Sequence, residues 1–173
     1  CFDCRQVLYE ESMFDGQKVS KSRIITSVDY SMVSMEAFEI YAANHDIHVM
    51  DFVLKLDAYT YYMMNLLDYL IGNTDRHWGN WGFLVDNRTN QPVRLFDLMD
   101  LNQTFLAYDT PDGANCMTTG NRKMSQREAA VEAVKKIGLN QRAEIKDEWF
   151  KGREKEREMF WCRFGILKEQ WKA

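Results

Sequence analysis

The strongest regular pattern of apolar residues lies between residues 51 and 71. Apolar side chains recur there every three or four positions, as they do on the core-facing side of a helix. The residues of this stripe are Phe52, Leu56, Tyr59, Met63, Leu66, Leu67 and Leu70. Further tyrosine and methionine residues widen the apolar face, so we expect the helix to be buried on several sides. Gly72 can end it in a left-handed turn.

The pattern changes from helical to strand-like after this helix. Residues 81–85 form a short apolar run, residues 86–90 are dense in turn-forming side chains, and residues 93–96 form a second apolar run. Pro92 can begin the returning strand, because that position need not donate a ladder hydrogen bond. The sequence therefore predicts a β-hairpin.

Two weaker signals precede the long helix. Asp15 and Gly16 predict a turn between two strands within residues 5–25. Ser34 can cap a helix over residues 35–41. His45 and His48 follow that helix without a nearby cysteine or carboxylate pair, so we interpret them as surface and packing residues.

The last third of the chain is predicted to be helical. Ser125 and Glu128 have the spacing of a capping box, and the helix that they begin should end near Gly138. We expect a second helix over residues 143–150 and a third over residues 153–172. The third helix carries an apolar stripe that we expect to pack on the rest of the protein: Phe160, Phe164, Leu167 and Trp171.

Composition limits the class of protein. The chain has 173 residues, which suits one domain, and its 46% hydrophobic and 13% aromatic content is enough for a real core. The net charge of −4 offers no basic surplus, so we expect no direct binding of nucleic acid. No apolar run approaches the roughly 20 residues of a membrane span, and no signal peptide is recognisable, so we expect a cytoplasmic protein.

The four cysteines give no metal site. Cys1 and Cys4 form one C-x-x-C pair, but a structural zinc ion needs a second pair of ligands, and the other two cysteines are far apart. Free thiols in a reducing cytoplasm are the simpler interpretation.

The candidate chemistry lies in residues 72–100, which contain Asp75, Asn80 and Asp97. Transfer of the γ-phosphoryl group of ATP needs a group that orients the attacking hydroxyl and divalent ions that neutralise phosphate charge. In protein kinases an asparagine follows the catalytic aspartate by five residues, as Asn80 follows Asp75, and a later aspartate holds the metal. Such a pair alone is weak evidence, because polar turns are rich in both residue types. The preceding helix, and the hairpin that should return Asp97 beside Asn80, strengthen it.

The segment TDRHWGNWGFL, followed by LFD, resembles the catalytic loop and metal-binding segment of the HipA-like kinases. The form D-R-H-x-x-N is also shared with the phosphatidylinositol kinases. The stretch GQKVSKSRIITSVDYSMVSMEAFEIY resembles, more loosely, the strand, interlobe hinge and first large-lobe helix of HipA-like proteins. Together the resemblance covers roughly residues 17–105.

This resemblance implies an α+β fold, mostly α: a protein-kinase-like large lobe with small β-hairpins, and a small lobe that is largely absent. Residues 1–25 would be the end of the small lobe and the approach to the hinge, and residues 26–173 the helical large lobe. Ile25 and Thr26 would lie near the adenine of the nucleotide; the alternative that the sequence leaves open is that the two strands within residues 5–25 are simply an edge hairpin.

The resemblance also assigns roles within the loop. Asp75 would be the base or orienting group, while Asn80 and Asp97 would hold Mg²⁺. His77 would support the catalytic loop or approach the transferring phosphate, and we favour the supporting role. Arg76 either pairs with a carboxylate or is solvated, and the sequence leaves both open.

The implied reaction is ATP- and Mg²⁺-dependent phosphorylation of a hydroxyl, by resemblance that of a protein serine or threonine. The same resemblance suggests a toxin–antitoxin context with an antitoxin-like regulator as partner. Two alternatives remain open: a lipid or small-molecule kinase, and a regulatory or binding module that keeps the fold without turnover.

Several kinase motifs are not found in the sequence. It contains no G-x-x-x-x-G-K-[ST], G-x-G-x-x-G, D-F-G or A-P-E motif, and Lys18 and Lys21 lie too close to the expected hinge to be the phosphate-binding lysine. These departures indicate an atypical kinase. Because phosphoryl transfer depends on gripping the phosphates, we expect the chain alone to fold but to be inactive as a kinase. A longer protein or a partner chain would supply the rest of the small lobe.

Residues 98–125 follow the metal-binding segment and contain two clusters of turn-forming residues. This is where a kinase carries its activation or substrate-binding segment. Asp100, at its start, is either an additional metal ligand or a structural carboxylate.

The predicted metal site should be weak without nucleotide. Mg²⁺ usually relies on substrate oxygens and keeps several waters, so Asn80 and Asp97 alone provide too few ligands. We expect titration calorimetry of the isolated chain with MgCl₂ to give no micromolar binding. Micromolar affinity in the absence of nucleotide would contradict this interpretation of the site.

Overall fold

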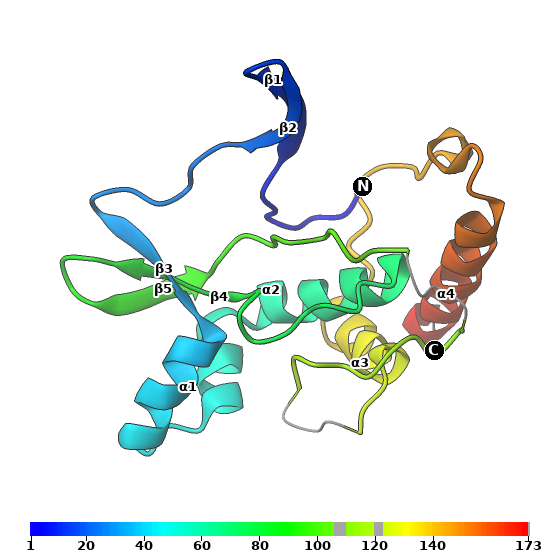
Figure 1. The fold of residues 1–173 in the computed structure, drawn as a ribbon. Coiled ribbons are helices and arrows are strands. Elements are labelled where there is room, and N and C mark those ends of the chain that lie inside the picture. The colour runs from blue at the N-terminus through cyan, green and yellow to red at the C-terminus, as the bar shows by residue number, and fades with distance from the viewer. Residues whose placement is uncertain (106–109, 120–122, 173) are drawn as a thin grey trace.

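Helix α2 (Val49–Ile71) runs through the middle of the molecule, and the other elements lie around it (Figure 1). The structure is a computed structural model that describes residues 1–105, 110–119 and 123–172. Besides α2, the elements in chain order are β1 (Tyr9–Phe14), β2 (Gln17–Ser22), β3 (Tyr30–Ser34), α1 (Met35–Asn44), β4 (Gly82–Asp86), β5 (Gln91–Leu95), α3 (Gln126–Ile137), the 3₁₀ helix η1 (Asp147–Phe150) and α4 (Glu154–Lys172).

Most of the apolar stripe of α2 lies in the core, as the sequence predicts. Tyr59 is the exception, because it is 36% exposed and its hydroxyl donates to Asp3 O at 2.8 Å. Met63, Leu66 and Leu70 are completely buried, and α3 and α4 both pack against this helix. Gly72 ends it with φ 62°, the left-handed conformation that was expected. One feature differs from the prediction: Asp57 has non-helical dihedral angles and kinks the helix. Its carboxylate accepts a hydrogen bond from Thr60 N at 3.2 Å, so it caps the longer second part.

A three-stranded antiparallel sheet in the order β3-β4-β5 lies beside the first turns of α2. The predicted hairpin is confirmed as β4 and β5, with a register irregularity between Leu84 and Val85 near Pro92. Strand β3 was not predicted, because its short sequence YSMVS lacks a clear alternation. Gly82 lets β3 approach closely, since a Cβ atom there would lie 2.1 Å from the carbonyl oxygen of Val33.

Three phenylalanine rings join the sheet to the helices. The Phe38 ring, on α1, lies 4.6 Å from that of Phe83 on β4 and 4.9 Å from that of Phe52 on α2, measured between ring centroids. Ser34 caps α1 by accepting from Ala37 N at 3.2 Å, which confirms the predicted start. The chain therefore enters α1 directly from the sheet edge, in a fixed direction.

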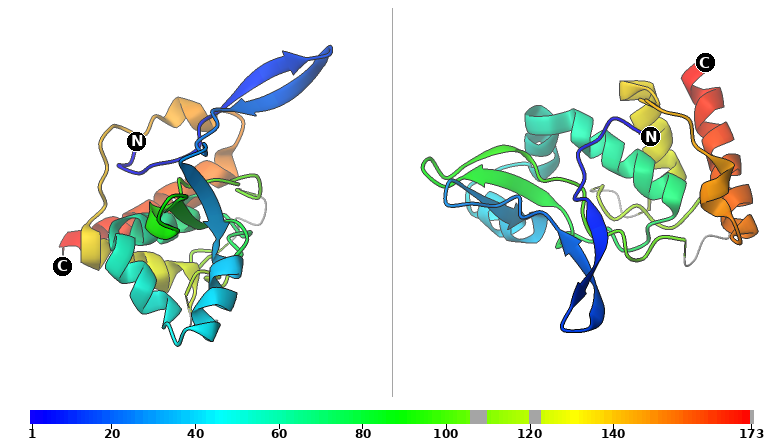
Figure 2. Two further views of the ribbon diagram at one scale, coloured as in Figure 1. Left: turned by 90° about the vertical axis from the view of Figure 1, so that its left-hand side faces the viewer. Right: turned by 90° about the horizontal axis from the view of Figure 1, so that it is seen from above.

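Strands β1 and β2 form a separate hairpin that projects from the body of the molecule in both Figure 1 and Figure 2. The predicted turn is confirmed, with Asp15 at φ 48° and Gly16 at φ 75°. An irregular segment, residues 23–29, leads from this hairpin to β3. Residues 1–7 instead lie along the helical body, where Leu98 N donates to Arg5 O at 3.0 Å and Val7 N donates to Leu98 O at 2.8 Å.

The predicted capping box is confirmed at the start of α3. Ser125 Oγ accepts from Glu128 N at 3.2 Å, and Glu128 Oε2 accepts from Ser125 N at 2.7 Å. These hydrogen bonds also hold the pKa of the Glu128 carboxyl below its usual value, the backbone bond having the largest effect. Helix α3 ends at Gly138, as expected.

The prediction of a helix over residues 143–150 is wrong. Only η1 forms there, because the preceding backbone pairs with the start of the chain. The N–H groups of Arg142 and Ala143 donate to Cys1 O at 2.7 and 3.3 Å, and Asn140 adopts φ 51°. These long-range contacts keep the segment extended.

Helix α4 matches its predicted range within one residue. Phe160, Phe164 and Leu167 are buried as expected, but Trp171 is 58% exposed. Arg163 is buried on this helix, where its Nη1 donates to Tyr69 O at 2.6 Å. Its guanidinium therefore links α4 to the end of α2.

The structure has no disulfide bond among the four cysteines, which are all free thiols. In the described ranges, none of the helices has the length and apolar character that crossing a membrane requires. Residues 106–109 and 120–122 of the expected substrate-binding segment lie outside the described residues.

The capping box offers a test of the fold. Replacing Ser125 with alanine removes the acceptor for Glu128 N, and we expect the free energy of unfolding to fall by about 1 kcal/mol. Urea denaturation followed by circular dichroism measures this change. The control is Ser20→Ala on the exposed strand β2, which should change stability by less than about 0.5 kcal/mol. Equal effects of the two variants would contradict the role of the cap.

Candidate active site

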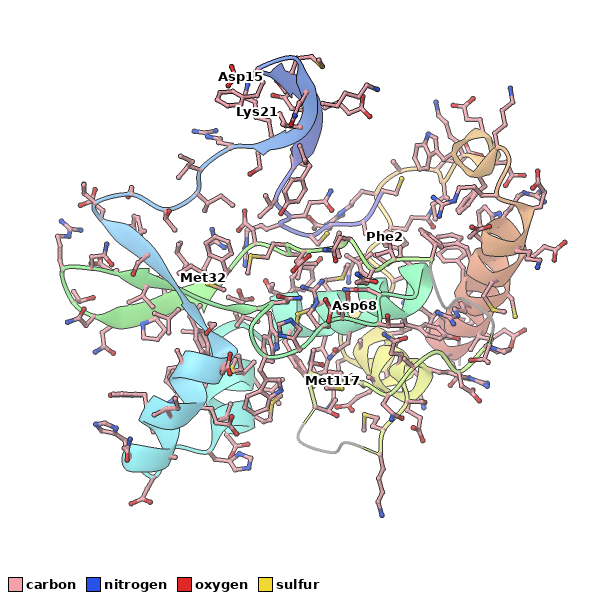
Figure 3. The ribbon with its side chains drawn as sticks, in the orientation of Figure 1. Phe2, Asp15, Lys21, Met32, Asp68 and Met117 are labelled. Carbon is pink, nitrogen blue, oxygen red and sulfur yellow. The ribbon has the colours of Figure 1, made fainter. Side chains whose placement is uncertain are left out.

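A buried ion pair lies beneath the loop that carries the candidate catalytic residues. Arg76 Nε donates to Asp68 Oδ2 at 2.8 Å, and Arg76 Nη2 donates to Asp68 Oδ1 at 3.1 Å. The two side chains are only 3% and 5% exposed. Asp68 lies on α2, near the centre of the molecule in Figure 3. Of the two alternatives left open for Arg76, pairing with a carboxylate is therefore correct.

The same arginine fixes the course of the loop. Its Nη1 donates to the carbonyl oxygen of Asn80 at 2.8 Å and to that of Met99 at 2.7 Å. Asn73 adds a further tie to the pair, because its Nδ2 donates to Asp68 Oδ1 at 2.9 Å. One guanidinium thus joins the end of α2, the loop, the approach to β4 and the segment that follows β5.

Asp75 lies on this loop with its backbone held and its carboxylate available. Its N–H donates to Asn73 Oδ1 at 3.3 Å, and its carbonyl oxygen accepts from Asn80 Nδ2 at 2.9 Å. The side chain is 42% exposed, and its polar neighbour is His77 Nε2, 3.9 Å from Oδ1. No described residue donates a hydrogen bond to this carboxylate, so it can accept a proton from a bound hydroxyl.

The side chain of His77 supports the loop by binding the backbone of Gly79. Its Nδ1 accepts from Gly79 N at 3.0 Å, so Nε2 carries the proton in the neutral ring. A side chain at position 79 would crowd this ring, since a Cβ there would lie 2.8 Å from His77 Cε1. The glycine is thus required by the histidine conformation.

Asn80 and Asp97 each keep an oxygen that could bind a metal. Asn80 Nδ2 is used in the loop, but its Oδ1 accepts no hydrogen bond from the residues described. Arg94 Nη1 donates to Asp97 Oδ1 at 2.7 Å, which leaves Oδ2 without a donor in the same part of the chain. Phe96 N donates to Gly82 O at 2.8 Å, so the hairpin returns the chain to the beginning of β4, next to Asn80. These donors suit Mg²⁺ with phosphate oxygens as further ligands.

Ile25 and Thr26 lie in the connection between β2 and β3, with Ile25 partly buried and Thr26 exposed. Within the described ranges, neither residue is hydrogen-bonded to the loop of Asp75. Asp100 follows the hairpin with φ 54° and is partly buried.

Sequence reasoning missed two residues of this region. Asp68 was overlooked within an apolar helix, although an acid inside a buried stripe was itself the signal that it has a charged partner. Arg94 was overlooked as well. Its position three residues before Asp97 was the signal that the two side chains could form an ion pair.

Comparison with known proteins bears on the fold. No protein-family model matches the chain, and no curated protein sequence matches it. Among solved structures, it is similar to the crystal structure of CtkA, a proinflammatory kinase from Helicobacter pylori. The TM-score is 0.56 at 14% sequence identity, and the match covers 96% of this chain and 76% of CtkA. The chain has a kinase-like fold.

Within this kinase-like fold, residues 114–119 pack beside the candidate loop. Trp78 Nε1 donates to the carbonyl oxygen of Met117 at 2.9 Å, and Thr118 Oγ1 donates to Asn65 Oδ1 on α2. Burial raises the pKa of the neighbouring Tyr61 to about 12, although hydrogen bonding to Asn65 and Thr118 acts in the opposite direction. The segment is therefore anchored both to the loop and to the central helix.

The buried ion pair predicts a large effect on stability. Asp68→Asn would leave the guanidinium of Arg76 buried without a compensating charge. We expect the free energy of unfolding to fall by about 3–5 kcal/mol, as is usual when one member of a buried pair is removed. Denaturant titration measures this loss. The matched control is Asp51→Asn, whose carboxylate is exposed, and a loss no larger than that of the control would refute the structural role of the pair.

Proposed function

We propose that this chain forms the catalytic part of a HipA-like kinase, which transfers the γ-phosphoryl group of ATP to a hydroxyl of a protein serine or threonine. The observation that carries the proposal is the loop itself. A half-exposed carboxylate with no hydrogen-bond donor among the described residues, that of Asp75, is held between a buried ion pair and the side chain of Asn80. The kinase-like fold supports it independently.

In this proposal Asp75 orients the substrate hydroxyl and accepts its proton. A carboxylate suits this role because the reaction needs positioning more than strong basicity. His77 holds the loop through its bond to Gly79 N and directs the Nε2 proton towards Asp75, at 3.9 Å from Oδ1. We assign it a positioning role.

Asn80 and Asp97 would hold Mg²⁺ through Oδ1 and Oδ2, respectively. With ATP present, the ion would neutralise charge on the phosphate oxygens. Arg94 holds the Asp97 carboxylate in one orientation through its other oxygen. Ile25 and Thr26 would contact the adenine from the connection that precedes β3. The regulator of the kinase would be an antitoxin-like protein.

The test is phosphoryl transfer from labelled ATP by the protein at its full natural length, with a serine-containing protein as acceptor. Asp75→Asn should lower the rate by about 10²–10⁴, the usual contribution of a positioned acid or base. ATP binding should stay nearly unchanged, since asparagine has the same shape. Asp97→Ala should weaken binding of Mg-ATP as well as turnover.

The control is Asp51→Asn, an exposed side chain on the first turn of α2, which should transfer phosphate at the parent rate. Transfer by Asp75→Asn at the parent rate would show that the loop is not catalytic. An unchanged affinity of Asp97→Ala for Mg-ATP would remove Asp97 from the metal site.

A further inference from the structure

A hollow of about 550 Å³ lies beside the candidate catalytic loop. Its volume is within the roughly 300–1,000 Å³ that is usual for ligand sites. Three parts of the chain form its wall: the first turns of α1, the loop after Asp75, and the segment anchored to Trp78. The lining residues are Glu36, Glu39, His77, Trp78, Gly79, Met117 and Thr119. Met117, which is labelled in Figure 3, is one of these lining residues.

Two carboxylates line the hollow without an ion-pair partner among the described residues. Glu36 and Glu39 are both exposed, and in the described part of the chain neither carboxylate forms an ion pair or a hydrogen bond. Glu36 is nevertheless directed at the loop, because its Oε2 lies 3.8 Å from the position that a Cβ on Gly79 would take. Its backbone N–H also donates to Trp78 O at 3.1 Å. Arg76 directly precedes the lining residue His77, but its side chain is buried and is already neutralised by Asp68.

The remaining wall suits a long side chain with a cationic end. The indole of Trp78 is held in one orientation by its bond to Met117 O. An indole attracts a guanidinium or ammonium group, and arginine and lysine cover apolar surface with their methylene stems. Met117 supplies such apolar surface next to the indole. The two carboxylates, the ring and the thioether therefore complement the same kind of side chain.

We propose that this hollow binds an arginine or lysine side chain of the protein substrate, close to the hydroxyl that receives the phosphate. The inference rests on the proposed function, because it identifies the occupant as part of the substrate. Proximity supports it: His77 lines the hollow, and its Nε2 is 3.9 Å from the carboxylate of Asp75. A substrate with its hydroxyl at Asp75 would thus have its neighbouring residues at the carboxylates. The acceptor sequence is then basic.

The experiment uses fluorescein-labelled serine peptides of one otherwise neutral sequence, in which a single arginine is moved through the positions on either side of the serine. Binding to the protein at its full natural length is measured by fluorescence anisotropy. We expect at least one arginine position to bind about tenfold more tightly than the same peptide with glutamine, as two exposed ion pairs allow. The preference should weaken at 0.5 M NaCl, because salt screens exposed charges.

The double variant Glu36→Gln, Glu39→Gln should abolish the preference while leaving the fold intact, since both side chains are exposed. The matched control is Glu169→Gln, an exposed glutamate on α4, which lies on the opposite side of the molecule from α1 (Figure 1). The control should keep the full preference. Equal binding of arginine and glutamine peptides at all positions, or a preference that survives the double variant, would overturn the proposal.

Phosphoryl transfer to the same peptides separates this inference from the proposed function. Transfer without any preference for arginine would refute the basic subsite and leave the kinase proposal standing. Preferential binding that depends on the two glutamates, without transfer, would support the subsite as a site for basic peptides and refute the kinase proposal.

Discussion

The ion pair between Arg76 and Asp68 is the constraint on which the candidate site depends. Removing two charges from water carries a large penalty, which is offset only when the geometry is good and the remaining hydrogen-bonding groups are satisfied. Both conditions hold here, since two bonds join the charges and Nη1 serves two carbonyl oxygens. An exposed loop of this length would adopt many conformations. Its backbone is instead attached through Arg76 to the buried Asp68 of α2, so Asp75 has a defined position without being buried itself.

The distribution of charge around the loop follows from the same arrangement. Arg76 is neutralised by Asp68, and Arg94 is neutralised by Asp97. The carboxylates of Asp75, Glu36 and Glu39 keep no such partner in the described structure, apart from the distant contact with His77. A polyphosphate approaching this surface would be repelled unless it arrived with a divalent cation, whereas a basic side chain would be attracted. The same set of ion pairs would therefore favour both ligands that the two proposals require: a nucleotide that carries a divalent cation, and a substrate with a basic side chain.

The features predictable from the sequence are those fixed by neighbouring residues. The helix α2 with most of its apolar stripe, the hairpin of β4 and β5, and the capping box at Ser125 depend on residues close in the sequence, and all three are confirmed, with Tyr59 of the stripe as the exception. The errors arise where distant segments meet. No α-helix begins at Ala143, because the N–H groups of Arg142 and Ala143 donate to Cys1 O. Asp57 interrupts a helix because its carboxylate also binds Arg5 and the N–H of Leu95.

The candidate site shows the same division. Its residue types and spacing could be read from the sequence, and the loop holds Asp75, His77 and Asn80 together as that spacing suggested. The sequence left the partner of Arg76 open, because Asp68 and Arg76 meet through space, with the turn at Gly72 between them. Glu36 meets the loop only because β3 pairs with β4 and sets the direction of α1.

The pairing of Asp97 with Arg94 bears on how a metal ion would enter the site. A carboxylate whose one oxygen already accepts a hydrogen bond from a guanidinium has lost part of its attraction for a free cation, since the positive charge beside it opposes the approach of another. Mg²⁺ bound to ATP would carry compensating negative charge, so the guanidinium beside Asp97 would oppose its approach less than it opposes that of the bare ion. The arrangement therefore favours a metal that arrives with its nucleotide. Under the proposed function, Asn80 and Asp97 would provide only two oxygens, and such a weak pair of ligands would be sufficient if the nucleotide brought the remaining ligands.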